Sequence, residues 1–205
     1  MRVAEYVHHD AVGLAKLVAD GEVTAAELRT AALEAARAVN PRINAIVETW
    51  PADDGPRPAG APLAGVPFLI KDIGAAMAGR RTELGSRLAA GNVARADSAL
   101  MRRVRRAGLV TFGRTATSEM AYSITTEPVL YGATRNPWDP ERSAGGSSGG
   151  AGAAVAAGVV PLAHGTDAAG SLRVPAAYNG LFGLKPTRGR VSLGPDFDEL
   201  FSGLA

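Results

Sequence analysis

Short apolar runs alternate with segments of helical composition through much of this chain, and this alternation restricts the fold more than any other feature. The runs have the length of strands that are covered on both faces. In chain order we expect a strand over Val66–Ile70, a helix over Asp97–Ala107, a strand over Leu109–Gly113, a helix over Gly150–Ala157 and a strand over Val159–His164. Strands that alternate with helices are typical of a mixed or parallel sheet, so the sequence predicts an α/β fold.

The N-terminal region is expected to be helical and to precede this sheet. Apolar residues recur at helical spacing from Asp10 to Ala19, and a second helix is expected from Thr24 to Val39 because it opens with T-A-A-E, a capping box. Prolines and aspartates between Trp50 and Pro62 predict a loop. We therefore expect N-terminal helices within residues 1–45 and a core within residues 64–192.

The composition disfavours several classes of function. The formal net charge is only +2, and the one dense basic cluster, R-R-V-R-R at 102–106, is expected to be the solvated face of a helix, so no nucleic-acid partner is predicted. The chain has no cysteine, and His8 and His9 are adjacent rather than at ligand spacing, so neither a metal nor another cofactor is predicted. We see no secretory signal and no transmembrane segment, and expect no membrane association and a cytoplasmic location.

Lysine is scarce, and this scarcity draws attention to Lys71. Of the 22 Lys and Arg residues, only Lys16, Lys71 and Lys185 are lysines. Arginine keeps its proton in a protein, whereas a desolvated lysine can lose it. Because Lys71 ends the apolar run from Val66 to Ile70, we expect burial to lower its pKa toward that of a general base working near neutral pH.

Glycine and serine are concentrated in two later segments. S-A-G-G-S-S-G-G-A-G covers Ser143–Gly152, and G-T-D-A-A-G-S-L-R-V-P-A covers Gly165–Ala176. Because the glycines flank serines and do not form a uniform tract, we interpret the region as a folded site and not as a linker. A serine hydroxyl becomes a useful nucleophile when a base accepts its proton, and a second hydroxyl can pass that proton on.

These two segments, together with G-V-P-F-L-I-K-D at Gly65–Asp72, resemble the amidase signature family in order and spacing. The resemblance extends to T-R-N-P-W-D at Thr134–Asp139 and to G-L-F-G-L-K-P-T-R-G-R-V at Gly180–Val191. It implies an α/β fold in which a mixed sheet is flanked by helices on both faces. It also implies an amidase that hydrolyses a carboxylic amide through an acyl-enzyme.

The resemblance assigns roles to particular residues. Lys71 matches the family's general base, Ser147 matches the serine that follows a cis peptide and relays the proton, and Ser171 matches the nucleophile. The groups expected to surround the nucleophile are the oxyanion-hole N–H groups of Ala168, Ala169, Gly170 and Ser171, and the supporting side chains of Ser148, Asp167 and Arg173. The family usually has glycine in place of Ala169, and a positive φ at that position would cost alanine about 1 to 2 kcal/mol.

Two other functions compete with this interpretation. G-x-S-x-G occurs twice between Gly145 and Gly150 and matches the nucleophile elbow of an α/β-hydrolase-like esterase, with Ser147 or Ser148 as nucleophile and His164 as base. That fold needs a strand directly before the serine, and prolines disfavour one there. The glycine loop is also compatible with a non-catalytic module that binds an anion or nucleotide, although no complete phosphate-binding motif occurs.

Members of the family are usually considerably longer than this chain. We therefore expect residues 1–205 to be the N-terminal catalytic part of an amidase domain, with a truncated fold and the C-terminal half absent. The expected partners are a small-molecule amide and either a second copy of the chain, as a homodimer, or the missing half. T-E-L-G-S-R-L-A-A-G at Thr82–Gly91 is more similar to stand-alone amidases, including those that open nylon-type cyclic amides. The particular amide is not predicted.

Overall fold

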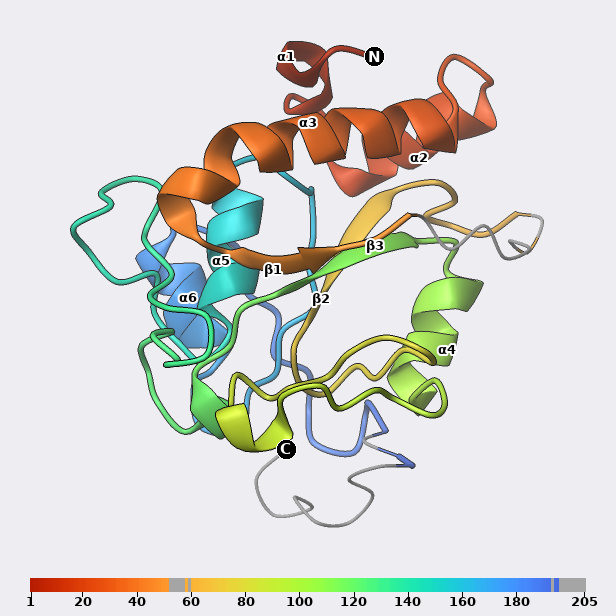
Figure 1. Ribbon diagram of the computed structural model, residues 1–205. Helices are drawn as coiled ribbons and strands as arrows, with labels where there is room; N and C mark the ends of the chain where they lie inside the picture. Colours follow the sequence, from red (N-terminus) through yellow and green to blue (C-terminus); the bar gives the residue numbers. More distant parts are fainter. Residues whose placement is uncertain (52–57, 59, 193, 196–205) are drawn as a thin grey trace.

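Within the residues that the structure describes, a three-stranded mixed sheet lies at the centre (Figure 1). The computed structural model describes residues 1–51, 58, 60–192, 194 and 195. The strands are β1 (Ile46–Thr49), β2 (Pro67–Lys71) and β3 (Val110–Thr115), in the order β1-β3-β2. β1 runs antiparallel to β3, whereas β2 runs parallel to it. The predicted α/β fold with a mixed sheet is therefore confirmed.

The helices expected from the sequence are present, with small changes of boundary. They are α2 (Ala11–Ala19), α3 (Ala25–Ile43), α4 (Ala99–Arg106) and α5 (Gly149–Ala156). α3 begins at the predicted capping box, in which the Thr24 side chain accepts the Glu27 N–H and the Glu27 carboxylate accepts the Thr24 N–H. The elements that the sequence did not predict are all short: α1 (Val3–Tyr6), α6 (Arg173–Tyr178), the 3₁₀ helices η1 (Arg87–Ala89) and η2 (Glu119–Ala121), and strand β1.

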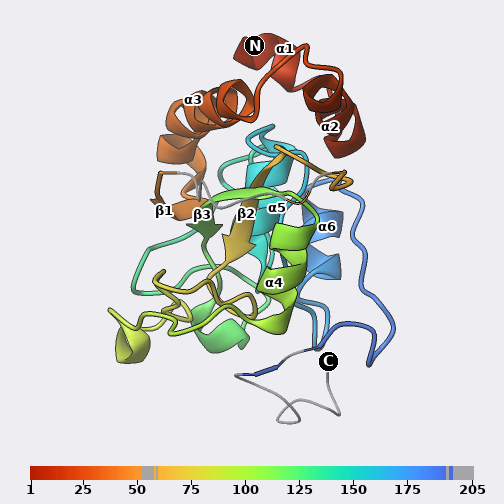
Figure 2. The same cartoon turned by 90° about the vertical axis from the view of Figure 1, so that its right-hand side faces the viewer.

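Helices cover both faces of the sheet, because side chains of β2 alternate between two apolar cores. Leu69 belongs to a core formed with α3 and α5, whereas Phe68 and Ile70 belong to a second core that contains Met101 and Val104 of α4. In Figure 1, α5 and α4 accordingly lie on either side of β2. Figure 2 shows α1, α2 and α3 as a layer on one side of the strands.

The predicted strand over Val159–His164 is wrong. Within the described residues this segment makes only an isolated parallel bridge, between Leu69 and Ala163. Pro161 has no N–H to donate, and the N–H of Val159 instead bonds to the carbonyl of Ala154 at the end of α5. The segment therefore lies beside β2 without forming a fourth strand.

Two further expectations concern particular stretches of chain. The loop predicted over 50–62 includes residues 52–57 and 59, which lie outside the described residues. Among the residues that are described, no helix is long and apolar enough to cross a membrane.

Candidate active site

Lys71 is the last residue of β2 and lies almost completely out of solvent, with 1% of its surface exposed. It follows Leu69 by two positions, so strand alternation directs it toward the same side of the sheet as α5. Its Nζ lies 2.7 Å from Ser147 Oγ and 2.7 Å from Thr166 Oγ1. The structure thus brings together Lys71 and one of the two predicted catalytic serines.

Burial changes the acid–base behaviour of this lysine. Loss of hydration lowers the pKa of Lys71 from 10.5 to about 7, and the opposing attraction of Asp167 is smaller. Near pH 7, Lys71 is then neutral in about half of the molecules. It can therefore accept a proton at a pH where an exposed lysine cannot.

Ser147 is fully buried immediately before α5, and its carbonyl accepts a hydrogen bond from the Ser118 N–H at 3.2 Å. The Gly146–Ser147 peptide bond is cis, as the family resemblance implied. The Ser147 hydroxyl faces Lys71 Nζ, so the side chain has the contact with the base that a proton relay requires.

Ser148 and Ser171 connect the two serine segments. The Ser148 N–H donates to the Ser171 carbonyl at 3.0 Å, and the Ser148 hydroxyl bonds to both the N–H and the carbonyl of Thr166 at 3.2 Å. Within the described part of the chain, no hydrogen bond joins the Ser171 hydroxyl to Ser147. The second step of the relay therefore stays a prediction.

Asp167 organises the turn that leads to Ser171. Its carboxylate accepts the N–H of Gly170 at 2.7 Å and that of Leu172 at 3.2 Å, together with the backbone N–H and two guanidinium hydrogen bonds of Arg173. Burial acts to raise the pKa of Asp167, but Arg173 and these N–H groups outweigh it and hold the pKa below its usual range. Asp167 is thus an ionised anchor for the turn.

The backbone of the turn differs from the expected oxyanion hole in one respect. Asp167 already engages the N–H of Gly170, whereas within the described residues no hydrogen bond involves the N–H groups of Ala168, Ala169 or Ser171. Gly170 has a φ of +123°, but Ala169 is not among the residues with positive φ, so alanine there is not strained. The binding of a carbonyl oxygen by these three N–H groups of the described turn therefore stays a prediction.

Two further side chains lie next to Lys71: Thr166, which was not assigned a role from the sequence, and His164, which was the base in the competing esterase interpretation. Thr166 contacts Lys71 Nζ directly, and it lies in the G-T-D segment that contains Asp167. The ring of His164 accepts the Lys71 N–H through Nδ1 at 3.3 Å, and burial followed by the proximity of Lys71 lowers the pKa of His164 to about 3. A neutral histidine bonded to backbone in this way supports a structural role and not the base of a hydrolase triad.

A buried ionic cluster fixes the end of β2. Arg114, 1% exposed, donates to Asp72, to Glu83 and, at 3.0 Å, to Glu48. Asp72 also accepts the Glu83 N–H at 2.7 Å. Because Asp72 directly follows Lys71, this cluster restrains the strand end that carries the base. The sequence analysis did not identify this cluster; a charged residue directly after the apolar run Leu109–Gly113 could have indicated it.

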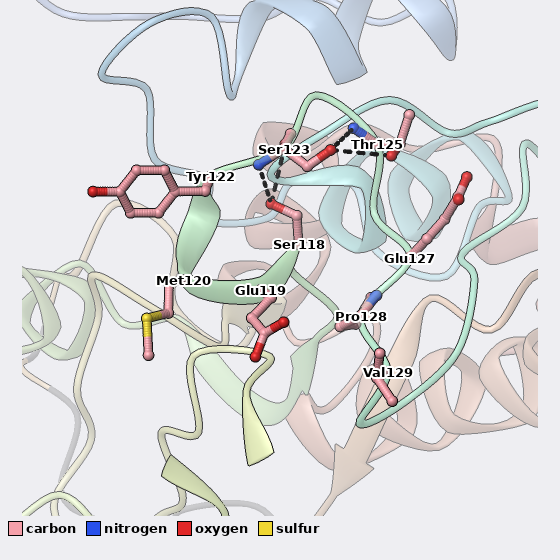
Figure 3. Close-up of a pocket in the computed structure, with 9 residues that line it drawn as sticks. All are labelled: Ser118, Glu119, Met120, Tyr122, Ser123, Thr125, Glu127, Pro128 and Val129. Carbon is pink, nitrogen blue, oxygen red and sulfur yellow. Dashed lines mark hydrogen bonds between the residues drawn. The ribbon is translucent and has the colours of Figure 1, made fainter. Parts of the chain in front are cut away.

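A cleft of about 470 Å³ adjoins the segment that contacts Ser147 (Figure 3). Figure 3 shows the Ser123 hydroxyl hydrogen-bonded to Thr125 on one wall of it. Its lining residues are Ser118, Glu119, Met120, Tyr122, Ser123, Thr125, Glu127, Pro128 and Val129. Among the described residues, no group of three or more His, Asp or Glu side chains is arranged to hold a metal ion.

The fold agrees with comparisons to known proteins. The amidase family model matches residues 27–198, and the chain belongs to this family, the amidase signature enzymes. It is 47% identical over 192 residues to the 6-aminohexanoate-cyclic-dimer hydrolase of Paenarthrobacter ureafaciens, covering 91% of this chain and 38% of that protein.

Two solved structures of amidases are also similar to this chain over most of its length. The 6-aminohexanoate cyclic dimer hydrolase complexed with substrate superposes with a TM-score of 0.85 at 44% identity, over 92% of this chain and 40% of that one. The native peptide amidase from Stenotrophomonas maltophilia superposes with a TM-score of 0.83 at 36% identity, over 91% of this chain and 42% of that one. The chain therefore spans about 40% of the length of the relatives that it matches.

Proposed function

We propose that this chain carries the catalytic residues of an amidase that hydrolyses a carboxylic amide through an acyl-enzyme on Ser171. The observation that carries the proposal is the 2.7 Å contact between the Ser147 hydroxyl and the buried amine of Lys71. A serine whose hydroxyl contacts an amine with a pKa of about 7 is suited to proton transfer, and the family resemblance of the segment Gly165–Ala176 assigns the nucleophile to Ser171.

The proposed first half-reaction forms an ester. The Ser171 oxygen attacks the amide carbonyl carbon, its proton passes to Ser147 Oγ, and the Ser147 proton passes to Lys71 Nζ. The N–H groups of Ala168, Ala169 and Ser171 stabilise the oxyanion that develops. The carbon–nitrogen bond then breaks, and Lys71 returns its proton through Ser147 to the departing amine.

The second half-reaction regenerates the serine. Water attacks the ester carbonyl carbon while one of its protons passes through Ser147 to Lys71. The carbon–oxygen bond to Ser171 breaks, Ser171 recovers a proton from the relay, and the carboxylic acid leaves. No cofactor is needed to balance either half-reaction.

The substrate class that we propose is a small linear or cyclic amide. The support is the similarity to a 6-aminohexanoate-cyclic-dimer hydrolase and the resemblance of Thr82–Gly91 to stand-alone amidases. Met120 and Tyr122 give the cleft beside Ser118 an apolar part, while Glu119 and Glu127 give it a polar part.

We further propose that activity needs additional polypeptide, either the remainder of an amidase chain or a second copy of this one. The support is the exposure of large apolar side chains, including Tyr122 at 92% and Phe182 at 93%. To test this, the remaining part of the Paenarthrobacter relative is supplied as a separate polypeptide, and association and turnover of a small aryl amide are compared with and without it. Turnover by the chain alone, as a monomer, would refute this part of the proposal.

Covalent labelling tests the chemistry. The full chain, with and without the supplied polypeptide, is treated with an activated fluorophosphonate and the adduct is located by peptide mass mapping. We expect the adduct on Ser171 and its loss in Ser171→Ala. An adduct on Ser147 or Ser148 would instead support the nucleophile-elbow alternative.

A further inference from the structure

The hydroxyl of Thr126 contacts the glycine loop, Gly145–Gly150, which carries Ser147. It donates to the Gly145 carbonyl at 2.9 Å, lies 3.3 Å from the Ser147 carbonyl, and accepts the Gly149 N–H at 3.0 Å. Thr126 is fully buried. One side chain thus contacts the backbone on both sides of the Gly146–Ser147 peptide.

The loop fits closely around this hydroxyl. A Cβ added to Gly149 would lie 2.4 Å from Thr126 Oγ1, and a Cβ added to Gly146 would lie 2.7 Å from the Ser123 carbonyl oxygen. Thr126 is itself held from the other side, because its carbonyl accepts the Thr134 N–H at 2.8 Å. The segment around Thr126 and the glycine loop therefore pack backbone against backbone, which leaves little freedom for either.

We propose that Thr126 is a positioning residue that holds Ser147 in hydrogen-bonding contact with Lys71. The Ser147 carbonyl is restrained by Thr126 and by the Ser118 N–H, so rotation of the peptide that would turn the Ser147 hydroxyl away from Lys71 breaks both contacts. This inference rests on the proposed function for its catalytic meaning. Its geometric content, the dependence of the Lys71–Ser147 contact on the Thr126 hydroxyl, can be measured without any activity.

Two substitutions separate the hydroxyl from the shape of the side chain. Thr126→Val keeps the branched shape and removes the hydroxyl, whereas Thr126→Ser keeps the hydroxyl. Thr111→Val is the matched control, because Thr111 is also buried but its hydroxyl has no hydrogen-bond partner among the described residues. If Thr126→Val does not fold, Thr126→Ala is compared with Thr126→Ser, since that pair also differs by the hydroxyl alone.

The full chain is labelled with ¹³C at the lysine ε-carbon, which gives only three signals, and amide exchange at Gly149 is followed in parallel. In Thr126→Val we expect Gly149 to exchange about tenfold faster, as loss of one buried hydrogen bond predicts. We also expect the Lys71 signal to move and fluorophosphonate labelling of Ser171 to slow about tenfold. Thr126→Ser should restore all three measurements, and Thr111→Val should leave them unchanged.

The outcomes separate the two proposals. If wild-type Ser171 is not labelled under any condition, the proposed function fails, while Gly149 exchange and the Lys71 signal still decide the role of Thr126. If Thr126→Val leaves both of these at their wild-type values, or if Thr126→Ser does not restore them, the positioning role is overturned.

Discussion

Replacement of Lys71 by methionine is expected to change how the stability of the folded chain depends on pH. Burial lowers the pKa of Lys71 from 10.5 to about 7, which corresponds to about 5 kcal/mol of unfavourable free energy for keeping the charged amine inside the fold. Methionine has a similar length and no charge, so Lys71→Met removes this cost. It also removes the contacts to Ser147 and Thr166, which costs about 1 to 3 kcal/mol for each hydroxyl left without a partner.

The pH dependence separates these two effects. Between pH 7 and 10.5 the unfolded chain holds the Lys71 proton and the folded chain does not, so the free energy of unfolding of the wild type rises with pH by about 1.4 kcal/mol per unit. Below pH 7 both states are protonated, and above 10.5 both are neutral. The stability of Lys71→Met relative to wild type should therefore fall by about 3 kcal/mol between about pH 7.5 and 9.5, whatever the hydrogen bonds contribute.

Urea unfolding at half-unit steps of pH measures this difference. Lys16→Met is the matched control, because Lys16 is exposed and its pKa is raised by Asp20, so its titration falls above the window. Titration of the three ¹³C lysine signals provides a direct second measurement, with the Lys71 signal identified by its absence from Lys71→Met. A relative stability that stays flat across this window would refute the argument that burial makes Lys71 a base.

Three further predictions follow from the site. Lys71→Arg should slow fluorophosphonate labelling of Ser171 as much as Lys71→Ala does, because neither variant offers an amine that loses its proton near neutral pH; retention of most labelling by the arginine variant would refute the assignment of the base. Thr111→Val should raise the free energy of unfolding by about 1 kcal/mol, because it removes a buried hydroxyl without a partner among the described residues; denaturant unfolding checks this, and destabilisation would contradict it. Asp167→Asn should lower stability by about 1 to 3 kcal/mol at neutral pH. Because the folded pKa of Asp167 is lowered, its contribution is present above about pH 4 and is lost in acid, so the two proteins should converge as pH falls; a constant difference would contradict this.

The parts of the fold that were predicted are those with strong local patterns. The apolar runs of β2 and β3 and the capping box of α3 are sequence signals that survive in the structure. β1 was missed because only four residues form it and Glu48 and Thr49 are polar, so it depends on pairing with β3. α6 was missed because it is short and contains Pro175. Both elements depend on contacts between residues far apart in the sequence.

The candidate site divides in the same way. The apolar run before it and the scarcity of lysine in the chain identified Lys71, and the family resemblance identified Ser147 and Ser171. The contacts of Thr126 and Thr166 could not be predicted, because threonines are common and only the folded arrangement places these hydroxyls beside the glycine loop and the base. The segment Val159–His164 was also only partly predictable. Its apolar composition correctly predicted burial of Val159 and Val160, but its backbone pairing depended on Pro161.

The position of β2 in the sheet has a consequence for the strength of the base. In the order β1-β3-β2 it is an edge strand, and its outer side is covered by the segment around His164, whose N–H bonds to the Leu69 carbonyl and whose ring accepts the Lys71 N–H. Among the described residues, this side of β2 is therefore covered by hydrogen bonds from one segment and not by a paired strand of the sheet. Because burial is what lowers the pKa of Lys71 to about 7, the supply of neutral amine to Ser147 depends on this cover of the strand as well as on the sheet itself.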